Sequence, residues 1–355
     1  MFKSKLFVIA LTIALVATAF FGSNAANAAP GNQITVRISA DKAAFTAGDT
    51  ALVNVTFSNS GRRAAKALAW FTPYEDVYES LFTVTRDGQP VAYLGTSYKR
   101  GLPTSADYVT LQPGESFTRT VDLGKYYDLS QTGKYSIRYD VAASSLFSEK
   151  GNAFRKDTLA SNKIDLAIEG RANYVLPVIT PDAVTGLNSY NRCSGTQQAT
   201  LVSARNQAST YAANALSYMY AGTAGARYTT WFGSYDLNRF TTVKYHFETI
   251  GQAIDTASIK FDCSCKQKNA FAYVYTNQPY TIYICSLFWT APLAGTDSKG
   301  GTLIHEISHF TVVASTDDWA YGQGAAQNLA ITDPNKAVDN ADSHEYFAEN
   351  TPFQQ

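Results

Sequence analysis

The stretch from Gly300 to Gly322, GGTLIHEISHFTVVASTDDWAYG, carries the strongest chemical signal in the chain. It contains His305, Glu306 and His309 in the pattern H-E-x-x-H. On an α-helix, positions four apart lie one turn apart on the same face, so both imidazoles can reach one metal ion. Glu306 projects about 100° further round the helix, where it can touch a metal-bound water without binding the metal. The pattern therefore predicts a catalytic zinc site with an open coordination position.

The residues around the two histidines predict that they lie on a helix. Asp297 or Ser298 can cap its start. The apolar residues recur at helical spacing: Leu303, Ile304, Ile307 and Phe310. A buried helix that carried two histidines by chance would lack this context and the carboxylates that follow within ten residues. We therefore favour the metal site.

A zinc ion bound by two histidines needs a third protein ligand, and residue types alone leave several candidates. These are Asp317, Asp318, Glu345, Glu349 and His344. The choice decides the class of zinc enzyme, because a glutamate from the C-terminal stretch would make the protein gluzincin-like.

The residues that follow the second histidine resemble a known family. Ser315 to Gly322, STDDWAYG, is similar to the G-T-x-x-D-x-x-Y-G motif of the aspzincins, the deuterolysin and peptidyl-Lys metalloendopeptidases. Alignment on Tyr321 implies that Asp318 is the third zinc ligand and that Tyr321 stabilises the oxyanion. The chain departs from the motif where Ala314 and Ser315 replace Gly and Thr. The loss of glycine restricts the backbone, so we expect a different loop before Asp318.

The resemblance covers the chain from about Ser189 to its C-terminus. The stretch Asn340 to Asn350, NADSHEYFAEN, is very similar to the family's tail. In lysine-specific members an Asp and a Glu of this tail line the lysine pocket, which implies this role for Asp342 and Glu345. Without the resemblance, two carboxylates three residues apart would be interpreted as a solvated helix face, or Asp342 as a helix cap.

The chain has four cysteines, all in its C-terminal half: Cys193, Cys263, Cys265 and Cys285. In an exported protein an even number indicates two disulfides, and three pairings are possible. Metal binding by cysteines is disfavoured outside the cell. The resemblance implies that Cys193 pairs with Cys263 and Cys265 with Cys285.

The N-terminal segment has the features of a secretory signal. Lys3 and Lys5 precede an apolar run from Leu6 to Phe21, and small residues follow up to Pro30. This order of a basic, an apolar and an A-x-A-like segment predicts a signal peptide over residues 1–28, cleaved after Ala28. No later stretch has the apolar length of a membrane span. We therefore expect a secreted protein that does not stay at the membrane.

Composition excludes some partners. The 355 residues include 29 basic and 29 acidic side chains, so no net field attracts nucleic acid or an anionic membrane. Only 16% of residues are charged, while the chain has 23 tyrosines and 20 phenylalanines. These values are typical of a soluble, β-containing secreted protein.

The residues from Gln33 to about Ile168 predict an all-β domain. Ile34–Ile38 and Ala51–Phe57 alternate apolar and polar residues, and glycine-containing turns separate such runs. We expect an immunoglobulin-like sandwich over residues 30–172. It has no cysteine and no metal or catalytic cluster, and its scattered Asp and Lys residues are interpreted as solvated strand faces.

The remaining residues predict a linker and an α+β domain. Residues 173–188 hold two prolines and a glycine, which indicates a linker. For residues 189–355 the resemblance implies a zinc-peptidase domain, mainly helical with a small antiparallel sheet whose exposed edge strand can pair with a substrate. Helices are predicted at Gln197–Tyr220 and Leu237–Ala257, and strands at Ile259–Phe261, Ala270–Tyr275 and Tyr280–Leu287. His246 and His344 fit no ligand spacing, and we expect ordinary polar or half-buried residues there.

The sequence thus predicts a secreted zinc endopeptidase that cuts polypeptides on the amino side of lysine. One Zn²⁺ would be held by His305, His309 and Asp318, and Glu306 would serve as general base and then as proton donor. The N-terminal sandwich would be a propeptide that aids folding or blocks the cleft.

Two other functions compete with this one. The first is a gluzincin-like peptidase with Glu345 or Glu349 as third ligand. The second is a non-catalytic secreted binding or adhesion protein that acts through its sandwich. Glu306 argues against the second, because a purely structural zinc site needs no base at that position.

Overall fold

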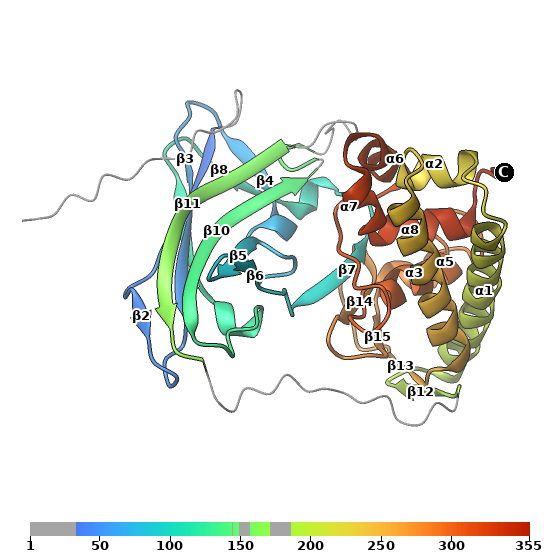
Figure 1. Ribbon diagram of the computed structural model, residues 1–355. Helices are drawn as coiled ribbons and strands as arrows, with labels where there is room; N and C mark the ends of the chain where they lie inside the picture. Colours follow the sequence, from blue (N-terminus) through green and yellow to red (C-terminus); the bar gives the residue numbers. More distant parts are fainter. Residues whose placement is uncertain (1–32, 144, 149–156, 171–185) are drawn as a thin grey trace, which may run out of the picture.

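The computed structural model describes residues 33–143, 145–148, 157–170 and 186–355. The predicted signal peptide and most of the predicted linker lie outside these residues. A β-rich N-terminal region (described residues 33–170) lies beside a mainly helical C-terminal part (residues 186–355), as Figure 1 shows. Among the described helices, none has the length and apolar character that crossing a membrane would require.

The N-terminal region is built from two main sheets. One has the order β1-β3-β9 and the other the order β2-β11-β10-β5-β6, and β4 pairs with β8. The bounds are β1 Ile34–Ser39, β2 Ala44–Phe45, β3 Leu52–Asn59, β4 Ala65–Leu68, β5 Phe82–Arg86, β6 Gln89–Pro90, β8 Tyr108–Leu111, β9 Ser116–Asp122, β10 Gly133–Ala143 and β11 Asp157–Ile168. Three short 3₁₀ turns complete it: Ala69–Phe71, Ser105–Asp107 and Leu123–Lys125.

The two sheets share one apolar core. Along β1 and β3, buried side chains alternate with half-buried or exposed ones, which confirms the period-two pattern of the sequence. Phe57 of β3 stacks on Phe117 of β9 and meets the ring of Tyr139 of β10 edge-on. The core therefore holds this region together without a disulfide.

The C-terminal part has eight helices among its described residues. They are α1 Gly195–Tyr220, α2 Ala226–Phe232, α3 Leu237–Thr256, α4 Ser286–Thr290, α5 Lys299–Ser308, α6 Gln323–Thr332, α7 Pro334–Val338 and α8 Ala341–Glu349. Ser194 caps α1 and Asp236 caps α3 through their side chains. Two helices were predicted with both ends, α1 and α3, and they are correct to within two residues at each end.

The sheet of the C-terminal part is mixed, so the predicted antiparallel sheet is wrong. Its order is β12-β13-β15-β14-β7, with bounds β12 Asn188–Asn191, β13 Ile259–Asp262, β14 Ala270–Tyr275, β15 Thr281–Ile284 and β7 Thr96–Arg100. β12, β13 and β15 run parallel. Parallel neighbours need a long crossover, which α1 to α3 supply between β12 and β13. The strand predicted to reach Leu287 stops at Ile284, where α4 soon follows.

The edge strand of this sheet comes from the N-terminal region. β7 pairs antiparallel with β14, with Tyr98 opposite Tyr273 and Lys99 opposite Ala272. Figure 1 shows β7 reaching across to β14. Among the strands of residues 189–355, β14 is an edge strand, and in the full chain β7 covers it.

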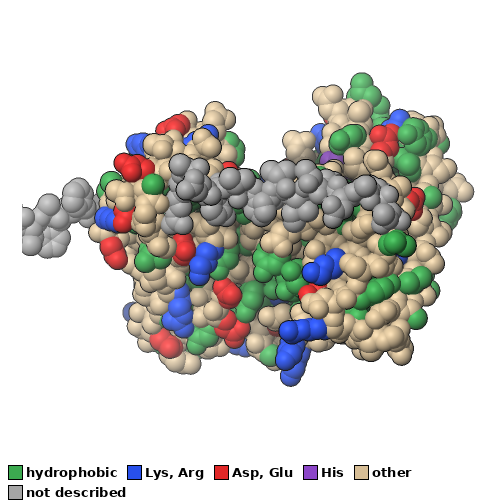
Figure 2. Space-filling model, turned by 90° about the horizontal axis from the view of Figure 1, so that it is seen from below, with side chains coloured by type: hydrophobic (Ala, Val, Ile, Leu, Met, Phe, Trp, Pro, Cys, Tyr) green, Lys and Arg blue, Asp and Glu red, His purple; other side chains and the backbone are tan. Residues whose placement is uncertain are grey.

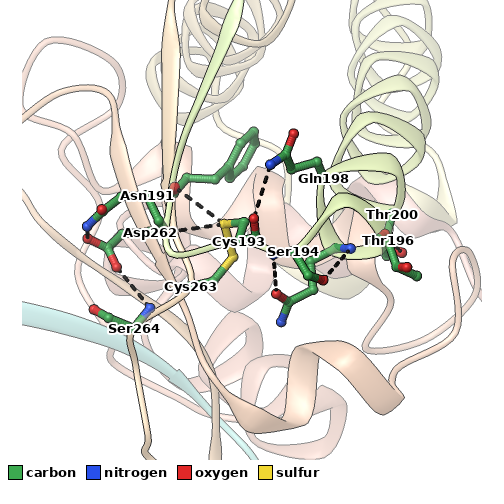
Figure 3. The surroundings of a disulfide bond; sticks show 11 residues. Asn191, Cys193, Ser194, Thr196, Gln198, Thr200, Asp262, Cys263 and Ser264 are labelled. Carbon is green, nitrogen blue, oxygen red and sulfur yellow. Dashed lines mark hydrogen bonds between the residues drawn. A yellow bond between two sulfur atoms is a disulfide. The ribbon is translucent and has the colours of Figure 1, made fainter.

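Two disulfides fasten the C-terminal part. They join Cys193 to Cys263 and Cys265 to Cys285, the pairs that the resemblance implied. The first lies between the start of α1 and the end of β13, and Gln198 of α1 donates a hydrogen bond to the Cys193 carbonyl (Figure 3). Sheet and helices are thus linked covalently. On the face of the molecule in Figure 2, charged side chains of both signs are spread over both parts.

Candidate active site

α5 presents the residues of the H-E-x-x-H pattern in the interior. His305 and Glu306 lie on this helix, and His309 is its C-cap; all three are fully buried. The Ser298 hydroxyl accepts a hydrogen bond from the Gly301 N–H at 2.9 Å. Of the two N-cap candidates the structure therefore selects Ser298.

α8 packs closely against the start of α5. The carboxylate of Glu349 accepts hydrogen bonds from the Ser298 N–H at 2.8 Å and from its hydroxyl at 2.7 Å. A Cβ atom on Gly301 would lie 2.1 Å from Oε1 of Glu349, so this approach requires glycine. Glu349 thus complements the N-terminus of α5 and is not directed at the two histidines.

Three ligand atoms converge on one point. The Nε2 atoms of His305 and His309 are 3.1 Å apart, and the two carboxylate oxygens of Asp318 lie 3.3 Å and 3.4 Å from them. The Asp318 side chain is 3% exposed. Neither of its oxygens has a hydrogen-bond partner among the described residues. A buried carboxylate needs compensation, and two imidazoles with one carboxylate are a donor set that suits zinc.

The other nitrogen of each imidazole faces an acceptor. His309 Nδ1 donates to the Thr316 carbonyl at 2.7 Å, and His305 Nδ1 lies 2.9 Å from Oδ1 of Asp342. The His309 hydrogen bond places its proton on Nδ1 and leaves its Nε2 lone pair for a metal. The charge contact with Asp342 favours the same arrangement in His305. Asp342 therefore supports the metal site, a position that the sequence did not predict.

Backbone contacts position the loop that carries Asp318. The Thr316 N–H donates to the Ser308 carbonyl at 3.1 Å. Oδ1 of Asn340 accepts from the N–H groups of the two residues after Asp318, both at 2.9 Å. The left-handed residue of the loop is Ser315, with φ of 53°, rather than Ala314. The backbone at Ala314 therefore does not need the conformational freedom of the glycine that the family motif has at this position.

Glu306 receives a hydrogen bond from outside its own part of the molecule. Its Oε1 accepts from the backbone N–H of Lys99, on β7, at 3.2 Å. Burial raises the pKa of Glu306 to about 7. A carboxylate with such a pKa can take up and release a proton near neutral pH.

Lys99 is a site residue that nothing in the sequence indicated. Its Nζ lies 2.7 Å from Glu345, 3.1 Å from Asp297 and 3.6 Å from Asp342, and its side chain is 1% exposed. Burial alone would lower the pKa of Lys99, but these three carboxylates outweigh it and hold the pKa well above its usual range. The interpretation of lysines in this region as solvated is thus wrong for Lys99.

Glu79 and Arg100 of the N-terminal region are also buried. The Tyr321 hydroxyl donates to Oε2 of Glu79 at 3.2 Å, and Nε of Arg100 donates to Oε1 at 2.9 Å. Burial raises the pKa of Tyr321 well above its usual range, so the hydroxyl keeps its proton. Nothing in the sequence indicated these contacts.

The remaining two histidines form a separate buried pair. His246 Nδ1 and His344 Nε2 are 3.0 Å apart. The residues are 9% and 0% exposed, so the expectation that they are half-buried is wrong. Their position among the apolar side chains of α2, α3 and α8 indicates a structural role.

A helix-borne H-E-x-x-H pattern, completed by a buried aspartate, defines a class of metal-dependent peptide hydrolases. Residues 217–349 match the family model described as lysine-specific metallo-endopeptidase. The chain is 44% identical to an extracellular protease of Aeromonas hydrophila, covering 86% of this chain and 89% of the relative. It is 37% identical to a peptidyl-Lys metalloendopeptidase of Grifola frondosa, covering 93% and 96%.

A solved structure, a zinc peptidase from Grifola frondosa, is 51% identical and covers 46% of this chain and 100% of its own, with a TM-score of 0.45. From the match to the family model and the two relatives, the chain belongs to the aspzincin family of lysine-specific metallo-endopeptidases and is a zinc metalloendopeptidase. Its disulfides are consistent with secretion.

Proposed function

We propose that this enzyme is secreted and hydrolyses peptide bonds on the amino side of lysine. The observation that carries the proposal is the placement of Lys99. Its ammonium lies among Asp342, Glu345 and Asp297 while its backbone N–H contacts Glu306. This is the arrangement needed by a substrate lysine that follows the cleaved bond, the P1′ residue.

Charge and shape both favour lysine in this pocket. An ammonium is a strongly hydrated point charge, so burying it requires opposite charges, which Asp342 and Glu345 supply. An apolar P1′ side chain would leave both carboxylates desolvated and unpaired, at a cost of roughly 2–5 kcal/mol. Arginine carries the same charge but is longer and planar, so a pocket closed around an ammonium admits it poorly.

The residues of the site divide the chemistry among them. Zn²⁺ bound by His305, His309 and Asp318 would polarise the scissile carbonyl and lower the pKa of water. Glu306 takes the proton of the attacking water and passes it to the leaving amine. Tyr321 donates a hydrogen bond to the oxygen on which negative charge develops.

The alternative third ligand has less support. Glu345 faces Nδ1 of His305 at 3.5 Å and pairs with Lys99, whereas Asp318 lies on the Nε2 side of both histidines. A role limited to binding or adhesion leaves the buried Glu306 without a purpose.

The N-terminal region fits the role of a propeptide that holds the enzyme latent. β7 covers the edge of β14, Lys99 fills the lysine pocket, and Glu79 binds the Tyr321 hydroxyl. We extend the proposal to an immunoglobulin-like sandwich over residues 30–172, a linker at 173–188 and a mature enzyme that begins near Ser189. N-terminal sequencing of the active secreted form tests this; a start at Ala29 or Pro30 contradicts it.

The specificity is tested by digestion of a mixed protein sample with the active enzyme, with cleavage sites read by mass spectrometry. We expect lysine to be strongly enriched at P1′, with arginine far behind. Cleavage sites without lysine enrichment would contradict the pocket and leave the zinc mechanism standing.

A further inference from the structure

We propose that the enzyme cleaves its own Tyr98–Lys99 bond, and that this intramolecular cut opens the latent chain. The inference rests on the proposed lysine specificity. It goes further by assigning one bond within β7 as the enzyme's own first substrate.

The backbone of β7 lies as a substrate would. It pairs antiparallel with the edge strand β14, and the ladder shifts register between Ala270 and Ala272, beside Lys99. Extended peptides bind to sheet edges in this way through main-chain hydrogen bonds. The Tyr98 ring packs on Tyr273 with centroids 4.8 Å apart, so the residue before the lysine is held as well.

Two contacts of Lys99 single out the bond on its amino side. Its ammonium occupies the carboxylate pocket, 2.7 Å from Glu345. Its N–H lies 3.2 Å from Oε1 of Glu306, and this nitrogen becomes the leaving amine if the bond to Tyr98 breaks. The side chain that must protonate the leaving group is therefore already in hydrogen-bond contact with it.

The reaction is a simple hydrolysis. Water adds its oxygen to the carbonyl carbon of Tyr98 and gives a proton to Glu306. The C–N bond then breaks, and Glu306 returns the proton to the nitrogen of Lys99. The second proton of the water passes from the new carboxyl group to this amine, which becomes an ammonium. The products are a carboxylate on Tyr98 and a new amino terminus at Lys99, which divide β7 and free it to leave β14.

The cut must occur within one molecule. Lys99 is 1% exposed and its backbone is part of a sheet, so a second enzyme molecule cannot reach the bond. The rate constant is therefore expected to be independent of chain concentration.

The test uses the full chain, purified without metal, to which Zn²⁺ is added, with fragments followed by intact-mass spectrometry. We expect a fragment that begins at Lys99, at a rate that does not change on dilution. Glu306→Gln should slow the cut by about 10²–10⁴-fold. Lys99→Arg should slow it by roughly tenfold or more, while Lys163→Arg, at a lysine with a 61% exposed side chain, should not.

A second readout needs no catalysis. In the metal-free chain, acetic anhydride should acetylate Lys134 and Lys163, whose side chains are 68% and 61% exposed, and spare Lys99. Acetylation of Lys99 as fast as of Lys163 would overturn its placement in the pocket and the proposal with it.

A further variant separates this proposal from the lysine specificity. Lys99→Asp sets a fourth carboxylate against the pocket, so repulsion should expel β7 and open the cleft without self-cleavage. If this variant cuts added proteins before lysine but the wild-type chain never yields the Lys99 fragment, self-cleavage is refuted and the specificity stands. If it cuts added proteins without preference for lysine, both proposals fail.

Discussion

The two parts of the molecule bury charge in different places. Among the described residues of the N-terminal region, the buried charged side chains are Glu79, Lys99 and Arg100, and they cluster where this region meets the C-terminal part. The C-terminal part buries carboxylates and histidines around α5 and α8. A buried charge needs a partner. Glu79 and Arg100 pair with each other, whereas Lys99 finds its carboxylates in the C-terminal part. At Lys99 the interface thus places a cation of one part among carboxylates of the other, as the proposed lysine pocket requires.

The two parts also differ in how they are stabilised. The N-terminal region relies on an apolar core between two sheets, whereas the C-terminal part adds two disulfides. The candidate active site lies in the C-terminal part, which the two disulfides stabilise. The following experiments probe this contrast, in order of decreasing effect.

The largest effect on activity is expected when the general base, Glu306, is replaced. Glu306→Gln, measured in the Lys99→Asp chain with its open cleft, should lower kcat/KM by about 10²–10⁴-fold and keep the zinc, because Glu306 is not a ligand. His305→Ala is the matched control and should lose zinc as well. Atomic absorption and peptide kinetics read both quantities. Near-normal activity of the Glu306 variant would refute the mechanism.

The next effect is a loss of stability when a disulfide is removed, and it should be confined to the C-terminal part. In the chain-entropy model, the Cys193–Cys263 loop of 70 residues contributes about 4.4 kcal/mol and the Cys265–Cys285 loop of 20 residues about 3.3 kcal/mol. Replacing either pair by serine should lower the unfolding transition of the C-terminal part. The unfolding transition of the N-terminal region should not change, as measured by hydrogen exchange of β3 and β10. Equal shifts in both parts would show that they unfold as one unit.

The proposed lysine pocket links the two parts. Asp342→Asn should lower kcat/KM for lysine substrates by roughly a hundredfold and flatten the preference for lysine over leucine. Because Asp342 also faces His305 Nδ1, zinc affinity should fall about 10–100-fold, so the kinetics need saturating zinc.

Two further variants complete this experiment. Glu345→Ala should retain zinc and Asp318→Ala should lose it. The reverse result would make Glu345 the third ligand.

The smallest effect is a pH dependence of stability. Burial lowers the pKa of His246 to about 4 and that of His344 to about 3, below the 6.5 of the unfolded chain. The unfolded chain therefore binds protons first as pH falls, so this stability is complete above pH 6.5 and is lost toward pH 4. Each histidine should account for about 1 kcal/mol between pH 7 and 5.5. His246→Gln should flatten the profile; an unchanged profile would contradict the buried neutral pair.

Local sequence patterns predicted the strands and helices whose formation depends on neighbouring residues in the chain. Alternation located β1 and β3, and capping residues with helical periodicity located α1, α3 and α5. The parallel pairing of β12, β13 and β15 was not predicted, because strand direction depends on crossovers between distant segments.

The sequence by itself determined the residues of the metal site, through their spacing and through the family motif. The i, i+4 geometry of a helix brings His305 and His309 together, and the motif after them supplies Asp318. Only the tertiary structure decided that β7 is the strand beside β14 and that Lys99 fills the carboxylate pocket. Pairing at a sheet edge uses backbone groups common to all residues, so the sequence does not mark which strand will pair. From the sequence alone a lysine is expected to be solvated. Only the fold brings the carboxylates of α8 next to Lys99.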